Sequence, residues 1–160
     1  MKLAVLGVLA CCLSCVSHAR ATAAETSPSL TTSARTSTVT VKATGLSNAQ
    51  GKVVFLLYTR SEDFITNLEG ADQRKAVSID NGSAAAVFEH VTPGVYAIAV
   101  FHDENDNGTV DYNFLGIPKE TTGASRDPRP KLRAPRFDEA AFTVSDPVHA
   151  SSIRMNSTYD

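Results

Sequence analysis

A series of short β-type segments with turn residues between them limits most strongly what this chain can fold into. Residues 38–42 alternate threonine or lysine with valine, and residues 52–60 (KVVFLLYTR) contain an almost unbroken run of β-branched, leucine and aromatic side chains. The first pattern predicts a strand with one buried face, and the second predicts a strand buried on both faces. No segment in this part of the chain has the pattern of a long helix.

Further strands are predicted at residues 74–80, 83–91, 95–102, 140–145 and 150–156. Asn81-Gly82 has the composition of a two-residue hairpin turn between the strands that flank it, and residues 92–94 (TPG) that of a second tight turn. The spacing of apolar residues within 61–71 predicts one helical turn. About seven short strands with turns between them predict an all-β fold, namely an antiparallel β-sandwich of immunoglobulin-like or transthyretin-like type. A small barrel is the alternative.

The core of this sandwich is expected to come from β-branched, aliphatic and aromatic residues at the inward strand positions. The residues expected to be largely buried are Val39, Val41, Phe55, Leu57, Phe88, Ile98, Val100, Phe142 and Val144.

The first residues have the pattern of a secretory signal peptide, in which Lys2 precedes an apolar run over residues 3–16 and small residues follow. The run is too short to span a bilayer, and no later segment is apolar enough to do so. We therefore expect a signal peptide over residues 1–21, a disordered Ser/Thr/Ala-rich linker over 22–36 and a β-sandwich domain over 37–157. The mature protein is expected to be exported to the periplasm or the exterior.

All three cysteines lie within the predicted signal peptide, so the mature domain is expected to have no disulfide and no Cys-ligated metal. Attachment of a lipid at Cys11 is an alternative, because a small residue precedes it. Only eight residues of the apolar run precede Cys11, which is short for the roughly 7–15 residues of a signal-peptide core.

Charge argues against a nucleic-acid partner. Without the two basic residues of the signal peptide, 13 Lys and Arg remain against 17 Asp and Glu, and the mature net charge is near −4. A local basic cluster is interpreted as a solvated loop, with an anion site as the alternative; it consists of Lys119, Arg126, Arg129, Lys131, Arg133 and Arg136.

Residues 103–111 (DENDNGTVD) place oxygen-bearing side chains at the spacing of a calcium-binding loop. Gly108 stands at the sixth position, where a sharp turn needs a positive φ. The twelfth position is Phe114 instead of the glutamate of an EF-hand, and no helical pattern flanks the loop. The pattern therefore predicts a calcium site of another kind, in which a strand enters the loop.

The predicted metal ligands are Asp103, Asn105, Asn107, Thr109 through its carbonyl and Asp111, with His102 and Glu120 as accessory ligands. Because only two of the main ligands are carboxylates, binding of Ca²⁺ is expected to be weak, of order 10⁻⁴–10⁻³ M. The alternative is a loop without metal, held by hydrogen bonds from its own Asx side chains to the backbone.

The stretch from Tyr96 to Glu120 (YAIAVFHDENDNGTVDYNFLGIPKE) resembles an exported bacterial family known as domain of unknown function 2141. The similarity lies in residues 101–105, 107–108, 111, 113–114 and 116–120, and it extends with weaker matches over roughly residues 38–156. Asp106, Arg126 and Asp127 depart from the family's pattern. The resemblance implies a transthyretin- or immunoglobulin-like sandwich outside the cytoplasm, and no activity.

Catalytic motifs are lacking: the sequence has no nucleophile elbow, phosphate loop or dinucleotide fingerprint. If the strands at 83–91 and 95–102 form a hairpin, His90 and His102 lie about 20 Å apart and cannot share a zinc ion. His149 is the third histidine of the mature chain.

We therefore expect a binding or structural module of the envelope more than an enzyme. Its partner would be an envelope protein, a glycan or a small ligand. The alternative is a small periplasmic hydrolase or ligand carrier with its site in the loop 103–136, and a deep pocket lined by His102, Tyr112, Phe114 and Arg133 would favour it.

Overall fold

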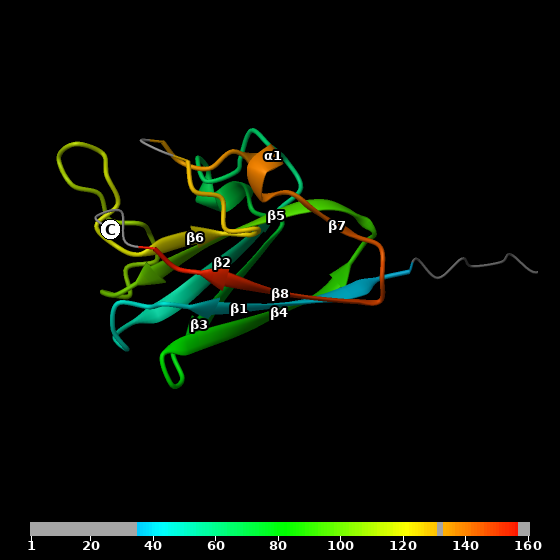
Figure 1. The fold of residues 1–160 in the computed structure, drawn as a ribbon, viewed down its shortest axis with the longest axis horizontal. Helices are drawn as coiled ribbons and strands as arrows, with labels where there is room; N and C mark the ends of the chain where they lie inside the picture. The colour runs from blue at the N-terminus through cyan, green and yellow to red at the C-terminus, as the bar shows by residue number, and fades with distance from the viewer. Residues whose placement is uncertain (1–34, 131–132, 157–160) are drawn as a thin grey trace, which may run out of the picture. The chain divides into compact units, whose positions relative to one another are not determined.

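The chain folds into two packed β-sheets in a computed structural model that describes residues 35–130 and 133–156 (Figure 1). The strands are β1 (Ser37–Thr44), β2 (Lys52–Tyr58), β3 (Gln73–Ser78), β4 (Ser83–Val91), β5 (Gly94–Asp103), β6 (Thr122–Ala124), β7 (Phe142–Val144) and β8 (Val148–Arg154). Two short helical turns, η1 (Leu68–Gly70) and α1 (Phe137–Ala140), complete the elements. One sheet has the order β4-β1-β8 and the other the order β3-β2-β5-β6, with β7 paired to β5.

The predicted all-β sandwich is thereby confirmed. The predicted signal peptide and nearly all of the linker lie outside the described residues. Within the described part of the chain, no helix is long and apolar enough to cross a membrane.

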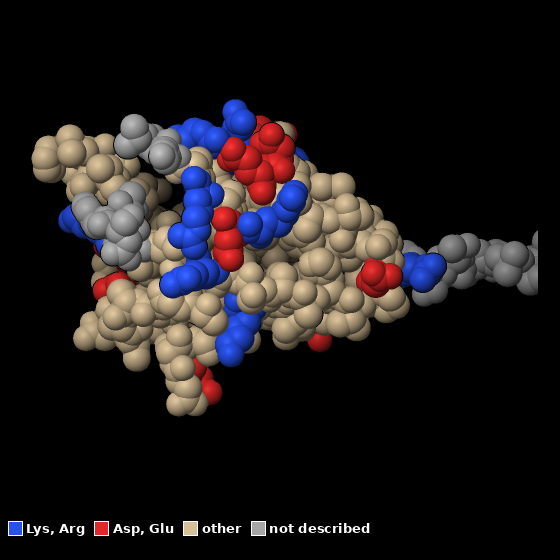
Figure 2. All heavy atoms as spheres, viewed as in Figure 1, with Lys and Arg blue, Asp and Glu red and all other residues tan. Residues whose placement is uncertain are grey.

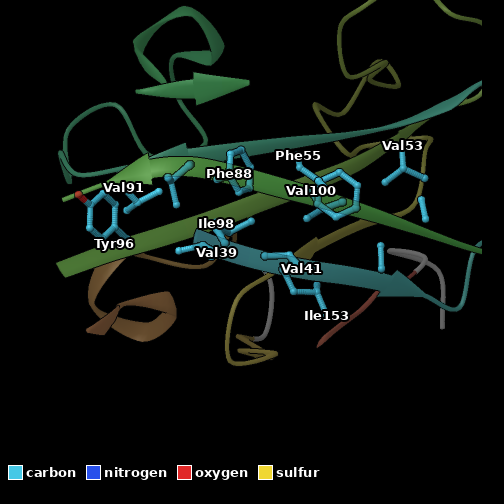
Figure 3. Packing of buried hydrophobic residues seen from close by; sticks show 14 of the residues in the cluster. Val39, Val41, Val53, Phe55, Phe88, Val91, Tyr96, Ile98, Val100 and Ile153 are labelled. Carbon is cyan, nitrogen blue, oxygen red and sulfur yellow. The ribbon is translucent and has the colours of Figure 1, made fainter. Parts of the chain in front are cut away.

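The main core lies between the two sheets. Val39 and Val41 alternate with less buried residues along β1, and they face Ile98 and Val100 of β5 across the core (Figure 3). Eight of the nine residues expected in the core are 2 % exposed or less. The exception is Phe142, which is only partly buried and stacks on His149 with ring centroids 4.6 Å apart, because β7 lies at the margin of its sheet.

A second apolar layer covers the outer face of β2, as the unbroken apolar run of that strand predicted. Val53, Phe55 and Leu57 point into the main core, whereas Val54, Leu56 and Tyr58 belong to the second cluster. Phe64, from the segment expected to form a helical turn, packs edge-on against Tyr58 with ring centroids 5.5 Å apart. Only η1 of that segment is helical, as a 3-10 turn.

The strand pairing corrects two expectations. Asn81 and Gly82 both have positive φ, as the predicted two-residue turn requires, yet β3 pairs with β2 and β4 pairs with β1. β3 and β4 therefore lie in different sheets, and the turn between them is closed by the bridge between Asp80 and Ser83. The turn at 92–94 likewise leads from one sheet to the other, so the hairpin assumed between His90 and His102 does not exist.

A short strand, β6, was missed within the predicted loop of residues 103–136. Its neighbour Ser125 fixes it to β5, because the Ser125 hydroxyl accepts the Ile98 N–H at 2.9 Å and donates to the Ala140 carbonyl at 2.6 Å. β1 and β8 are also parallel, which turn signals in the sequence could not indicate. β6 fixes the far end of the acidic loop that follows β5.

Candidate functional site

The acidic loop, residues 103–120, joins β5 to β6. Asp103 ends β5 opposite Lys52, the first residue of β2, so the loop leaves the sandwich from a central pair of strands. At its other end, the Thr121 carbonyl accepts the His102 N–H at 2.9 Å. Both ends of the loop are therefore fixed to the five-stranded sheet.

Asp103 organises the first turn of this loop. Its carboxylate is almost fully buried, and it accepts the backbone N–H groups of Asn107 at 3.0 Å and of Gly108 at 2.7 Å. Asp106 and Gly108 have φ values of 59° and 79°, which wrap the backbone around the carboxylate. The glycine expected to allow a sharp turn therefore does so.

The amides of Asn105 and Asn107 converge on Asp111. The Asn105 side-chain amide donates to Asp111 Oδ2 at 2.7 Å, and that of Asn107 donates to Asp111 Oδ1 at 3.2 Å. The Asn107 Oδ1 in turn accepts the backbone N–H of Thr109 at 2.9 Å. The structure thus brings together the side chains of Asp103, Asn105, Asn107 and Asp111, which the sequence spacing had grouped.

Glu120 braces the two sides of the loop. Its carboxylate accepts the Glu104 N–H at 3.1 Å and the Asp111 N–H at 3.2 Å, and the residue is buried. Burial raises the pKa of Glu120, these two hydrogen bonds lower it, and the nearby carboxylates of Asp111 and Asp103 raise it again, so that the pKa lies above its ordinary value. A cation in the loop would relieve this repulsion between carboxylates.

His102 faces away from the centre of the loop. Its ring is fully buried, and its Nε2–H donates to the Gln50 carbonyl at 2.7 Å, since a carbonyl can only accept. Its Nδ1 lies 3.3 Å from the Ser47 hydroxyl, and that hydroxyl donates to Glu104 at 2.6 Å. Both ring nitrogens have polar neighbours outside the acidic loop, Gln50 and Ser47. The structure therefore does not direct His102, which was predicted as an accessory ligand, toward the candidate metal site.

Residues that the sequence gave no reason to select hold the loop from outside. Gly51 packs so closely that a Cβ there would lie 1.9 Å from the Asp103 carbonyl oxygen. Lys52 pairs with Asp106 at 2.8 Å, and Arg74 donates to the Gly108 carbonyl at 2.6 Å. The hydrogen bond from Ser47 is the main cause that lowers the pKa of Glu104. These contacts are far apart in sequence, and no local pattern signals them.

The donor set suits a hard cation. The side chains that converge carry carboxylate and amide groups, whose oxygens are ligands that Ca²⁺ prefers, and they include no sulfur. Among the described residues, no group of three or more His, Cys, Asp or Glu side chains is arranged to hold a metal ion, so a site here depends on asparagine and backbone oxygens. The amides of Asn105 and Asn107 present nitrogen to Asp111, and both would have to rotate to present oxygen to a cation.

Two surface hollows lie elsewhere on the described domain. One, of about 220 Å³, is lined by residues that include Leu57, His90 and Tyr96, and the other, of about 420 Å³, is lined by residues that include Phe64 and Phe137. None of the four residues named for the alternative, the hydrolase or carrier pocket, lines either hollow: His102, Tyr112, Phe114 and Arg133. Phe114 instead projects into solvent, and Arg133 pairs with Glu139.

Comparison with known proteins gives one match. A protein-family model described as an uncharacterized protein conserved in bacteria (DUF2141) matches residues 41–151, which include the five-stranded sheet, most of the three-stranded sheet and the whole acidic loop. No curated protein and no solved structure matches the chain.

Proposed function

The chain belongs to the DUF2141 family of uncharacterised bacterial proteins, and we propose that it is an exported binding module whose acidic loop holds Ca²⁺ weakly. In this proposal the β-sandwich is a rigid support, and the loop that leaves β5 is the working surface. The partner would be an envelope protein, a glycan or a small ligand. The observation that carries the proposal is the convergence of Asp103, Asn105, Asn107 and Asp111 on one turn.

In the proposed site the two main carboxylates have different roles. Asp103 already serves two backbone N–H groups, so in the proposed site it shapes the turn as well as contributing charge. The Asp111 carboxylate accepts the side-chain amides of Asn105 and Asn107, which can rotate, and its oxygens are therefore the ones freed for a cation. Since few carboxylates contribute, the affinity is expected to stay in the range of weak extracellular sites, of order 10⁻⁴–10⁻³ M.

Calcium should stabilise the folded protein. A ligand that binds only the native state adds RT ln(1 + [L]/Kd), which is about 1.4 kcal/mol at a tenfold excess over Kd. We therefore expect saturating Ca²⁺ to raise the melting temperature by several degrees over a chelator-treated sample, and Mg²⁺ to do less because it demands stricter octahedral geometry. Differential scanning calorimetry measures both shifts.

Asp111→Asn should abolish the calcium shift while leaving the sheets intact, because it removes charge from the centre of the loop. Asp106→Asn is the matched control: it removes the same charge from the same loop, but Asp106 points outward to Lys52, so the shift should remain. Identical melting of the wild-type protein in Ca²⁺ and in chelator would instead make the loop an Asx-rich turn without metal.

Export is tested separately. The charge, apolar run and small residues of the first 24 positions lead us to expect cleavage by a signal peptidase. Mass spectrometry of protein isolated from the envelope or the medium should find an N-terminus between Arg20 and Glu25. A retained Met1, or a lipid on Cys11, would contradict this prediction.

A further inference from the structure

The acidic loop ends in an exposed apolar tip, which we define as Tyr112, Phe114 and Leu115. These side chains are 51 %, 94 % and 66 % exposed, respectively. The segment that carries them projects away from both sheets (Figure 1), and its surface is largely uncharged in the space-filling view (Figure 2). Exposed apolar residues scattered singly are ordinary, but adjacent ones on a projecting loop mark sites of interaction.

Backbone hydrogen bonds hold the apolar tip in this exposed position. The Asn113 N–H donates to the Ile117 carbonyl at 2.9 Å, and the Gly116 N–H donates to the Asn113 carbonyl at 3.0 Å. The Asn113 side-chain oxygen also accepts the N–H groups of Leu115 at 2.9 Å and of Ile117 at 3.0 Å. Tyr112 and Pro118 close the turn as a β-bridge. A preorganised tip loses little entropy when it binds.

The size of the apolar tip decides between two kinds of partner. An aromatic side chain buries roughly 150–250 Å², so three side chains supply on the order of 400 Å². A stable protein interface needs about 800 Å² from each partner. Binding at the boundary between lipid headgroups and acyl chains, about 5–10 Å deep, has no such threshold, because its strength scales with the apolar area that is buried. A small convex projection therefore suits a bilayer better than a second protein surface.

Charge around the apolar tip supports the same choice. Residues 112–118 carry no charge, and the tip is flanked by Asp111 and Lys119. The Lys119 side chain is exposed, whereas Asp111 is partly buried and its carboxylate accepts the side-chain amides of Asn105 and Asn107. The acidic groups at the base of the loop are engaged: Asp106 pairs with Lys52, and Glu120 is buried. The tip presents an apolar end first, then a tyrosine and then a lysine. This order matches the order in which a bilayer presents acyl chains, the headgroup boundary and the phosphates.

We propose that the apolar tip of Tyr112, Phe114 and Leu115 inserts into the surface of a phospholipid bilayer, with Lys119 at the level of the lipid phosphates. The hydrogen bonds that shape the tip involve no side chain of the candidate calcium ligands, since Asp111 takes part only through its backbone carbonyl, which accepts the Lys119 N–H at 2.8 Å. Binding of the tip is therefore expected in chelator as well as in Ca²⁺. A negative calcium experiment would therefore not contradict insertion of the tip into a bilayer, and a negative vesicle experiment would not contradict the calcium site.

Binding to vesicles of phosphatidylethanolamine and phosphatidylglycerol tests the proposal on the full mature chain. The wild-type protein should sediment with the vesicles, and the double variant Phe114→Ser, Leu115→Ser should partition at least tenfold less. Val148→Ser is the matched control, because Val148 lies on β8 and is 66 % exposed, as Leu115 is. Unchanged melting temperatures would show that all the variants fold.

The chain has no tryptophan, so Phe114→Trp provides a reporter at one position. Its emission should shift to shorter wavelength when vesicles are added and should be quenched by lipids brominated near the headgroup. Val148→Trp should show neither effect. The proposal is overturned if the wild-type protein stays in the supernatant or if the double serine variant binds as well as wild type. Self-association of the wild-type protein that the double variant abolishes, without vesicle binding, would overturn it in favour of a second copy.

Discussion

Replacing Phe55 with alanine is expected to lower the free energy of unfolding by about 3–5 kcal/mol. Phe55 lies on β2, is fully buried, and points into the core between the two sheets (Figure 3). Its neighbours across the strand pairs are Val100 on β5 and Lys75 on β3. Because β2 is hydrogen-bonded on both sides, the surrounding backbone cannot collapse far into the cavity, and the loss should be near the upper part of that range. Urea denaturation monitored by circular dichroism measures it.

Phe142→Ala provides the comparison, because it deletes the same ring from a different place. Phe142 is only partly buried, and much of its contact is the stack on His149 at the margin of the sandwich. Less apolar surface returns to water when this ring is lost, so we expect a cost of about 1–2 kcal/mol. Equal losses of unfolding free energy for the two variants would mean that β7 belongs to the centre of the core and does not lie at the margin of its sheet.

The two phenylalanines show what the strand pattern in the sequence could predict and what it could not. The alternation in residues 38–42 and the continuous run in 52–60 predicted one buried face for β1 and two for β2, and both are confirmed. Phe142 also occupies a strand position with the right alternation. A strand's place in its sheet depends on which partner it pairs with, and periodicity along the chain carries no such information.

The turn at Asn81-Gly82 shows the same limit. Its two positive φ values follow from its composition, and they were predicted. Whether the strands beyond a turn pair with each other depends on where their apolar faces can be buried. Ala84, Ala86 and Phe88 of β4 face the core from the three-stranded sheet, whereas β3 is an edge strand of the other sheet without a buried residue. β4 therefore pairs with β1, and β3 pairs with β2.

More of the acidic loop than of the strand topology could be predicted from the sequence, because the hydrogen bonds that organise the loop are local. Asp103 contacts residues four and five positions later, and Asn105 contacts Asp111 six positions later, so sequence spacing translates almost directly into proximity. The supports from Ser47, Gly51 and Arg74 come from other strands and loops, and nothing at those positions distinguishes them from ordinary loop or edge residues. Likewise, the sequence placed Phe114 at the twelfth position of the loop and in the wall of an alternative pocket, and it did not predict that the side chain is exposed, because exposure is a property of the fold.

Gly51→Ala tests the most restrictive of these supports, and we expect it to destabilise the protein by about 2–5 kcal/mol. The backbone of Gly51 has φ 66°, in which a side chain costs about 1–2 kcal/mol. In addition, a Cβ at this position would lie 1.9 Å from the Asp103 carbonyl oxygen, so β5 or the start of the acidic loop must move. Forced displacement of packed backbone adds about 1–3 kcal/mol.

Gly82→Ala separates the cost of the positive φ from the cost of the close contact with Asp103. Gly82 has a similar φ of 71°, but a Cβ there meets no atom within 4 Å, so its cost should be that of the backbone conformation alone. The excess loss in Gly51→Ala then measures the close contact with Asp103. Equal losses in the two variants, within about 0.5 kcal/mol, would show that the contact is not tight.

The same pair of variants connects this contact to the proposed calcium site. Displacing the Asp103 backbone moves the carboxylate that holds the N–H groups of Asn107 and Gly108, so Gly51→Ala should lose the calcium-induced rise in melting temperature. Gly82→Ala should keep it, because that turn lies between β3 and β4, outside the acidic loop. A Gly51→Ala protein that still responds fully to calcium would show that the loop takes its shape from its own side chains and not from the contact with Gly51. That contact would then contribute to stability alone.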